Sequence, residues 1–202
     1  IFLGYYATKR RKIKDGLLWR MVLIYYQYYM PPRSRKILIT GIGGYICSNI
    51  AARLVPHYNL VGVGIGTMFP VLKEVFKERV KLVEADITDM KTLQKSSKGA
   101  EIIIHGASPQ TERFCQEHPK EARRVIVEGT KVVADIAKKQ GAFLIHLSTL
   151  SVYSTHRERA MPLTEDSELL PDSNYGLFKA EAEKEARRAH SLVLRLSNVF
   201  GT

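Results

Sequence analysis

Short apolar runs alternate with longer amphipathic segments from residue 36 to residue 202. The runs are rich in β-branched residues and have the length of buried strands, while the segments between them repeat apolar residues at helical spacing. We expect strands at 36–40, 60–64, 80–84, 101–105, 143–147 and 192–196. We expect helices at 45–55, 71–79, 121–140 and 175–190. Strands alternating with helices are typical of an α/β fold with a doubly wound parallel sheet and helices on both faces.

A glycine-rich turn follows the first predicted strand and opens the first predicted helix. Its candidate nucleotide-binding residues are Gly41, Gly43 and Gly44, with Tyr45 and Ile46 beginning the helix. Glycines let the backbone approach a pyrophosphate, and the N-terminal amides of the helix then face that anion. In this strand–turn–helix context the turn indicates a dinucleotide site, although a tight turn without a ligand would have the same sequence.

Two positions depart from the usual dinucleotide-binding pattern. Cys47 stands where a third glycine would bring the helix close to the sheet, so its side chain adds bulk there. After the second strand, residues 61–67 contain neither the acidic residue that binds a ribose nor an arginine for a 2′-phosphate. The sequence therefore leaves NAD against NADP undecided, with loss of binding as the alternative.

Further candidate nucleotide contacts follow the third and fourth strands. They are Asp86 and Ile87 after the third strand, and His105, Gly106 and Ala107 at the end of the fourth. A carboxylate at Asp86 can accept a hydrogen bond from an adenine amino group, or it can cap a helix that starts near Thr88. The small residues after His105 allow a nucleotide to cross the sheet edge, and we expect His105 itself to be structural.

Hydroxyl-bearing residues end the fifth predicted strand, at the edge where parallel sheets bind ligands. They are Ser148, Thr149 and Ser151. Downstream, Tyr175 and Lys179 stand four positions apart at the start of a helix and therefore share one face. An ammonium group near a phenol favours the phenolate, so we expect Lys179 to lower the pKa of Tyr175 toward that of a general base.

These motifs together resemble those of the extended short-chain dehydrogenase/reductase family, the group of nucleotide-sugar epimerases and dehydratases. The matching segments occur in family order: Thr40-Gly41-x-x-Gly44, Asp86-Ile87, His105-Gly106-Ala107, Ser148-Thr149, Tyr175-x-x-x-Lys179 and Arg195-Leu-Ser-Asn198-Val-Phe-Gly201. The resemblance implies a Rossmann fold that holds NAD or NADP. It also implies an epimerase, dehydratase or reductase that transfers hydride to or from a nucleotide-sugar-like alcohol.

The resemblance assigns roles to individual residues. Tyr175 would be the acid/base, Lys179 would orient the nicotinamide ribose, and Thr149 would bind the substrate hydroxyl. Ser148, Ser151 and Asn198 would lie on the substrate side. The family continues beyond this point into a substrate domain, so we interpret residues 36–202 as an NAD(P)-binding domain truncated before it.

Charge and composition change the picture at the N-terminus. The 202 residues carry a formal net charge of +11, but residues 1–36 hold nine of the 31 Lys and Arg, and one acidic residue. The same segment holds six of the ten tyrosines and the only tryptophan, Trp19. We therefore predict an aromatic and basic extension at 1–35 that contacts a membrane surface or a protein partner. Nucleic-acid binding is disfavoured because residues 37–202 are nearly neutral and carry no recognised reader motif.

Composition also excludes several classes of protein. Two cysteines cannot form a disulfide-rich scaffold, so we expect a reducing compartment, either the cytoplasm or an organelle matrix or stroma. The sequence contains no run of 18 uncharged apolar residues, so we expect no ordinary membrane-spanning helix. The histidines are scattered along the sequence, so we expect no metal site. The alternative to an enzyme is a non-catalytic family member that serves as an accessory subunit of a larger, membrane-bound complex. A homodimer is a further candidate assembly.

Overall fold

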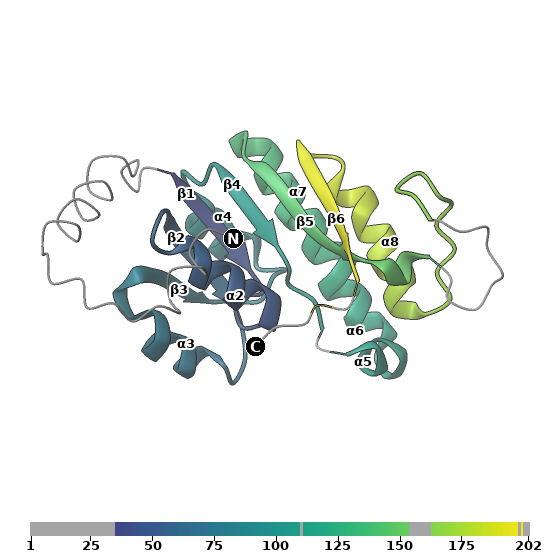
Figure 1. The fold of residues 1–202 in the computed structure, drawn as a ribbon, viewed down its shortest axis with the longest axis horizontal. Helices are drawn as coiled ribbons and strands as arrows, with labels where there is room; N and C mark the ends of the chain where they lie inside the picture. Colours follow the sequence, from purple (N-terminus) through teal and green to yellow (C-terminus); the bar gives the residue numbers. More distant parts are fainter. Residues whose placement is uncertain (1–34, 110, 154–162, 198, 200–202) are drawn as a thin grey trace, which may run out of the picture. The chain divides into compact units, whose positions relative to one another are not determined.

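Six parallel strands form one sheet in the computed structural model, in the order β3-β2-β1-β4-β5-β6 (Figure 1). The strands are β1 (Lys36–Thr40), β2 (Asn59–Gly64), β3 (Val80–Glu84), β4 (Ile102–His105), β5 (Phe143–Thr149) and β6 (Ser191–Leu196). The structure describes residues 35–109, 111–153, 163–197 and 199, which lie in one compact unit, Arg33–Thr202. This strand order is that of the Rossmann fold, so the predicted fold class is confirmed.

Helices cover both faces of this sheet. They are α2 (Tyr45–Leu54), α3 (Phe69–Phe76), α4 (Met90–Ser97), α5 (Glu112–Glu117), α6 (Pro119–Arg123), α7 (Gly129–Gln140) and α8 (Asn174–Ala186). Helices α2 and α3 lie on one face, over β1 to β3, whereas α4, α7 and α8 lie on the other (Figure 1). None of the helices in the described ranges is both long and apolar enough to cross a bilayer.

The central strand β1 shows why an uninterrupted apolar run forms a strand in this sheet. Ile37, Leu38 and Ile39 are each at most 3% exposed. Leu38 packs into the core cluster under α4 and α7, while Ile37 and Ile39 pack into the cluster under α2 and α3. Both faces of the strand are covered by helices, so an alternating polar pattern would place polar side chains in a core.

The helices differ from the predicted ones in four places. The helix expected at 71–79 is α3, which begins at Phe69, ends at Phe76 and is followed by a 3-10 helix over Lys77–Arg79. The helix expected at 121–140 begins earlier, with α6, and contains a π-helical turn at Arg124–Glu128 before α7 ends at Gly141, whose φ is 68°. Helix α5 was not predicted, and α4 was considered only as a helix starting near Thr88, the alternative at Asp86; each begins after a side-chain cap, supplied by Asp89 and Thr111. Helix α8 ends at Ala186 because the chain must turn to place the His190 carbonyl against the Leu144 amide of β5.

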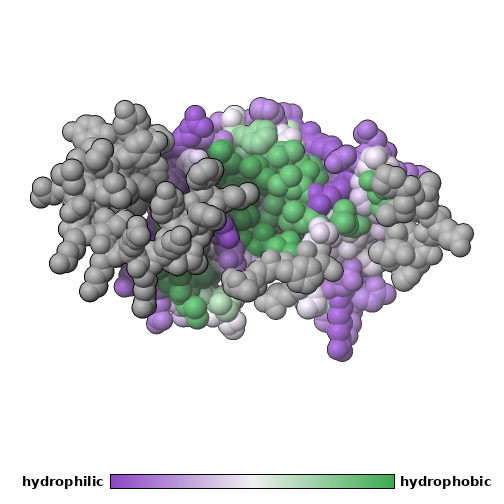
Figure 2. Space-filling view, viewed as in Figure 1, coloured by the Kyte–Doolittle hydropathy of each residue, from purple (hydrophilic) through white to green (hydrophobic). Residues whose placement is uncertain are grey.

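The edge strand β6 presents apolar side chains on the face away from α8. Leu192 and Leu194 are 45% and 37% exposed. Figure 2 shows the corresponding face over β4 to β6 as a hydrophobic surface, and no helix in the described part of the chain covers it. The predicted extension at 1–35 lies outside the described residues, apart from Arg35.

Candidate active site

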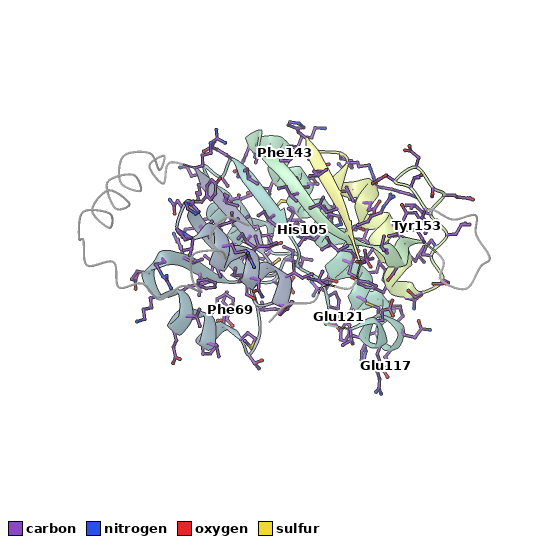
Figure 3. All side chains as sticks on the ribbon, viewed as in Figure 1. Phe69, His105, Glu117, Glu121, Phe143 and Tyr153 are labelled. Carbon is purple, nitrogen blue, oxygen red and sulfur yellow. The ribbon has the colours of Figure 1, made fainter. Side chains whose placement is uncertain are left out.

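A cavity of about 480 Å³ lies at the carboxyl ends of strands β1 to β4. It is lined by the glycine turn after β1, residues 63–68 after β2, residues 85–87 after β3 and residues 106–109 after β4, together with Thr111, Phe114, Glu121 and Val125. Figure 3 shows His105 inside the fold and Glu121 nearer the end of the molecule formed by α5 and α6. The carboxyl edge of a doubly wound sheet is where such folds bind ligands, so this cavity is the candidate site.

The predicted glycine turn forms one wall of the cavity. Gly41 has a φ of 73°, and a Cβ added there would lie 2.7 Å from backbone atoms of Gly106 and Ala107. The turn closes with a 2.9 Å hydrogen bond from the Gly44 amide to the Gly41 carbonyl. Gly44 is also the N-cap of α2, and no side chain caps the first-turn amides of that helix. The positive end of the α2 dipole is thus available to an anion beside Gly43 and Gly44, which both line the cavity.

The side chain of Cys47 packs against Gly106, the glycine that follows β4. The Cys47 side chain is 3% exposed, and its sulfur occupies the space that a Cβ at Gly106 would need. Gly106, which follows β4, therefore leaves the space that the Cys47 side chain needs in place of the third glycine of the turn. Burial raises the pKa of the Cys47 thiol to about 11, which keeps it neutral.

The cavity wall after β2 carries no charged side chain. Its residues there are Gly64, Ile65, Gly66, Thr67 and Met68. Among the described residues that line the cavity, Asp86 and Glu121 are the charged ones, and both are acidic. Residues 61–67 contain neither an acidic residue to bind a ribose nor an arginine to bind a 2′-phosphate. No other described residue that lines the cavity supplies a cation in their place.

Asp86 and Ile87, the candidate nucleotide contacts after β3, line the cavity. One carboxylate oxygen of Asp86 accepts hydrogen bonds from the amide and hydroxyl of Thr88, at 2.8 and 2.7 Å. The other accepts a 3.1 Å hydrogen bond from Arg124. Burial would raise the pKa of Asp86, but these hydrogen bonds hold it below its usual range. The alternative role, a helix cap, belongs instead to Asp89, which caps α4.

His105 links three elements inside the fold and does not line the cavity. It is 1% exposed, with Nδ1 2.7 Å from the Thr40 hydroxyl and Nε2 2.9 Å from the Thr130 hydroxyl. Burial lowers the pKa of His105 to about 3, so the ring is neutral. This is the structural role expected for it, whereas its neighbours Gly106 and Ala107 line the cavity. The side chains of Tyr45 and Ile46 do not line it.

Tyr175 lies near the hydroxyl groups of Thr149 and Ser108, which brings the candidate catalytic pair Tyr175 and Thr149 together. Burial raises the pKa of the phenol, and Cys115 and Glu112 raise it further, while the two hydroxyl groups lower it by less. The expected lowering of the Tyr175 pKa by Lys179 is therefore wrong. Burial is the largest effect on the pKa of the phenol, and the Lys179 ammonium donates a 2.5 Å hydrogen bond to the Leu147 carbonyl.

Ser108 connects Tyr175 to the cavity and was not among the predicted site residues. It lines the cavity, and its buried hydroxyl makes no hydrogen bond of good geometry in the described part of the chain. A buried hydroxyl without a partner is suited to bind a ligand atom. In the sequence Ser108 belongs to the run of small residues after His105 that would let a nucleotide cross the sheet edge, but no pattern gave its hydroxyl a role of its own.

The predicted substrate-side residues separate in the structure. Ser148 is 5% exposed and donates a 2.6 Å hydrogen bond to Glu183 of α8, so its substrate-side placement is corrected. Ser151 stays beside Thr149, whose hydroxyl accepts a 3.1 Å hydrogen bond from the Ser151 amide. Asn198 lies outside the described residues.

A second buried histidine lies next to His105. His146 is 1% exposed, its ring centroid is 5.2 Å from that of His105, and neither of its ring nitrogens has a hydrogen-bond partner among described residues. Burial lowers the pKa of His146 well below 6.5, and the charges of Lys179 and Arg187 lower it further. The unfolded chain thus binds a proton more readily than the folded chain does. The stability linked to neutral His146 is present above about pH 6.5 and is lost as the pH falls.

Replacing His146 with leucine is expected to flatten this acid dependence. The free energy of unfolding of His146→Leu should fall less between pH 7 and pH 5 than that of the wild type, by about 1 kcal/mol per pH unit. Urea titrations at several pH values measure it. The exposed His118 provides the control, because His118→Gln removes an imidazole that is not part of the core. Parallel pH curves for His146→Leu and the wild type would contradict the prediction.

Comparison with known proteins identifies a family whose members are similar to this chain in sequence. Residues 35–202 match the family model described as the RmlD substrate binding domain. UDP-arabinose 4-epimerase 1 of Arabidopsis thaliana is 28% identical over 189 residues, which cover 85% of this chain and 44% of that protein. The dTDP-glucose 4,6-dehydratase of Mycobacterium tuberculosis is 25% identical over 173 residues, covering 81% of this chain and 52% of that enzyme.

A solved structure is similar to this chain in fold. The Bordetella bronchiseptica enzyme WbmG, in complex with NAD, superposes with a TM-score of 0.74 at 25% identity. The match covers 85% of this chain and 56% of that one. The chain thus spans about half the length of these three proteins. By its family match, strand order and motif order, this chain belongs to the RmlD substrate binding domain family, within the NAD-dependent epimerase/dehydratase group of extended short-chain dehydrogenases/reductases.

Proposed function

We propose that the cavity binds NAD and that the chain carries the cofactor-binding half of an enzyme acting on a nucleotide-linked sugar by hydride transfer. One observation carries this proposal: the glycine turn at Gly41 and the uncapped N-terminus of α2 form one wall of the cavity, and Ser108 joins the same cavity to Tyr175. An anion-binding turn and a buried phenol thus meet at one sheet edge.

The residues present fit a dinucleotide. Gly41, Gly43 and Gly44 would allow the pyrophosphate to approach the first-turn amides of α2. The wall formed by residues 64–68 offers the hydroxyl of Thr67 near the end of β2 and no cation. A 2′-phosphate would carry two negative charges into a cavity whose charged lining residues are acidic, so we favour NAD over NADP.

Side chains of this chain would bind the sugar oxygen whose proton is transferred in the reaction. Bound NAD would accept or return hydride at a sugar carbon. The raised pKa of Tyr175 keeps the phenol protonated at neutral pH, so the phenol is ready to donate a hydrogen bond to a sugar oxygen. Thr149 would hold the same oxygen from β5, and the unpartnered Ser108 hydroxyl would complete its hydrogen bonding with a ligand atom.

The substrate class follows from the relatives. Two of them are, by name, an epimerase of UDP-arabinose and a dehydratase of dTDP-glucose, and both names denote nucleotide sugars. We therefore propose a nucleotide sugar as substrate, and an epimerisation, dehydration or reduction as the reaction. The comparisons give no support to the accessory-subunit hypothesis.

Binding of the cofactor is the first test. Titration of the full 202-residue chain with NADH, followed by nucleotide fluorescence, should show saturable binding. NADPH should bind at least about tenfold more weakly, a difference of about 1.4 kcal/mol. Addition of UDP-sugars or dTDP-sugars to the NADH complex then tests the substrate class by competition and by spectral change. A chain that binds neither reduced nucleotide would refute the proposed function, and stronger binding of NADPH would refute the cofactor choice.

A further inference from the structure

One face of α8 contacts β5 at three successive turns. Tyr175, Lys179 and Glu183 are spaced four residues apart, so they share that face. Tyr175 lies near Thr149, Lys179 donates to the Leu147 carbonyl, and Glu183 accepts a hydrogen bond from Ser148. Three consecutive residues of β5 are therefore each engaged by one turn of the same helix. The third member of this face, Glu183, has no role in the function proposed above.

Glu183 is a fully buried carboxylate with four hydrogen bonds. Its side chain is 0% exposed. Arg195 of β6 donates to both of its oxygens, from Nε at 3.0 Å and from Nη2 at 2.8 Å. Ser148 donates at 2.6 Å, and Arg187 donates at 3.0 Å. A buried carboxylate satisfied so completely remains ionised: burial would raise the pKa of Glu183, but these donors lower it by more.

Arg195 anchors this carboxylate to the loop after β5. Besides Glu183, its guanidinium donates to the Tyr153 hydroxyl and, at 2.8 Å, to the Glu165 carbonyl. The Tyr153 hydroxyl in turn donates a 2.9 Å hydrogen bond to the Thr164 carbonyl. Glu183 thus joins α8, β5, β6 and the segment that starts at Leu163 through one hydrogen-bonded network.

Lys179 lies one turn from this carboxylate and is itself 4% exposed. Burial lowers the pKa of Lys179 to about 8, and Glu183 acts against this effect. The other titratable groups that act on or near Lys179 are Cys47 of α2, His105 of β4 and His146 of β5, and Arg187 of α8. The cysteine and both histidines are neutral at pH 7, and Arg187 is cationic. Of these groups, Glu183 is the one that supplies negative charge.

We propose that Glu183 is a positioning residue for the Tyr175–Lys179 pair: its buried carboxylate, clamped by Arg195, keeps the Lys179 ammonium charged and holds α8 against the end of β5. The importance of the pair rests on the proposed function. The effect of Glu183 on Lys179, however, is a property of this chain alone and needs no cofactor to be measured.

The test is a pH titration of Lys179 by NMR in the full chain labelled with ¹³C-lysine, with Lys179→Met to assign its resonance. In Glu183→Gln the midpoint of Lys179 should fall by about one pH unit or more, a tenfold rise in its acid dissociation constant. Glu183→Asp keeps the charge and should restore most of the wild-type midpoint. Glu181→Gln is the matched control, because Glu181 lies on the same helix, pairs with Arg123 at 2.8 Å and is 31% exposed. It should leave Lys179 unchanged.

A second variant keeps the test informative if Glu183→Gln does not fold. Glu183→Gln/Arg195→Met removes both charges, so no guanidinium is left without its carboxylate. The proposal is overturned if the Lys179 midpoint in either folded variant equals that of the wild type, or if Glu181→Gln moves it as far.

NADH binding separates this proposal from the proposed function. If the wild type binds NADH, the basic limb of the plot of affinity against pH should move with the Lys179 midpoint in Glu183→Gln. A limb that stays in place would overturn the positioning role. If the wild type does not bind NADH, the proposed function fails, while the NMR midpoint still decides whether Glu183 controls Lys179.

Discussion

Alanine at Gly41 is expected to abolish NADH binding and to lower the free energy of unfolding by about 2–5 kcal/mol. Two effects add at this position. The φ of 73° is in the left-handed region, which disfavours every residue with a Cβ. The new Cβ would also lie 2.7 Å from the backbone of Gly106 and Ala107, which cannot yield as a flexible side chain would. Either a shift of the turn or a shift of the segment after β4 follows, and both segments form walls of the cavity.

Gly141 offers a matched control for Gly41. Its φ of 68° is nearly the same, but a Cβ there would meet no atom within 4 Å. Gly141→Ala should therefore show the conformational cost alone, about 1–2 kcal/mol, and should leave NADH binding intact. Urea unfolding and NADH titration of both variants give the comparison. Equal losses of stability in the two variants would show that the contact with Gly106 and Ala107 carries no weight.

Methionine at Arg195 is expected to lower the free energy of unfolding at neutral pH by about 3–5 kcal/mol. The substitution removes two of the four hydrogen bonds to Glu183 and leaves its carboxylate buried. The cost should shrink in acid. Arg195 contributes to holding the pKa of Glu183 below its unfolded value of 4.5, so this stability is present above about pH 4.5 and is lost as the pH falls. In the variant the carboxyl is protonated at higher pH, which removes the buried charge.

Two further variants test this explanation. Arg195→Met combined with Glu183→Gln should recover most of the lost stability, because neither a charge nor its partner remains unpaired. Arg113→Met breaks an exposed pair with Glu117, whose side chains are 84% and 51% exposed, and should cost at most about 1 kcal/mol. Chemical unfolding at pH 7 and at pH 4 measures all of them. A double variant no more stable than Arg195→Met would mean that the arginine acts through its packing or through Tyr153.

The fold was predictable because its signals are local. The apolar run of β1, the glycine turn after it and the stop at Gly141 each act within a few residues, and the structure places all of them as expected. The short helices α4 and α5 were not assigned from the sequence because they have eight and six residues, which is too short to show a repeating apolar pattern. Their start signals, Asp89 and Thr111, are single caps that also occur in loops.

The site was predictable only in part, because several of its features depend on contacts between distant residues. Ser148 and Thr149 are equally plausible in sequence, and only the packing of α8 against β5 decides which hydroxyl meets Glu183. The ammonium of Lys179 bonds to a carbonyl 32 residues earlier, which no spacing rule foresees. The fit of Cys47 against Gly106 likewise joins two positions that the sequence keeps far apart.

Because both cysteines are buried, their reaction with an alkylating reagent can report local opening of the structure. Cys47 and Cys115 are 3% and 0% exposed, and burial raises the pKa of each thiol, so neither presents a reactive thiolate while the surrounding structure is closed. Alkylation must then wait for an opening event. Cys47 packs with α2 against β4, whereas Cys115 packs with α8 in a separate cluster. The alkylation rates of Cys47 and Cys115 therefore report separately on the opening of the structure around α2 and around α8, and no residue has to be substituted to measure them.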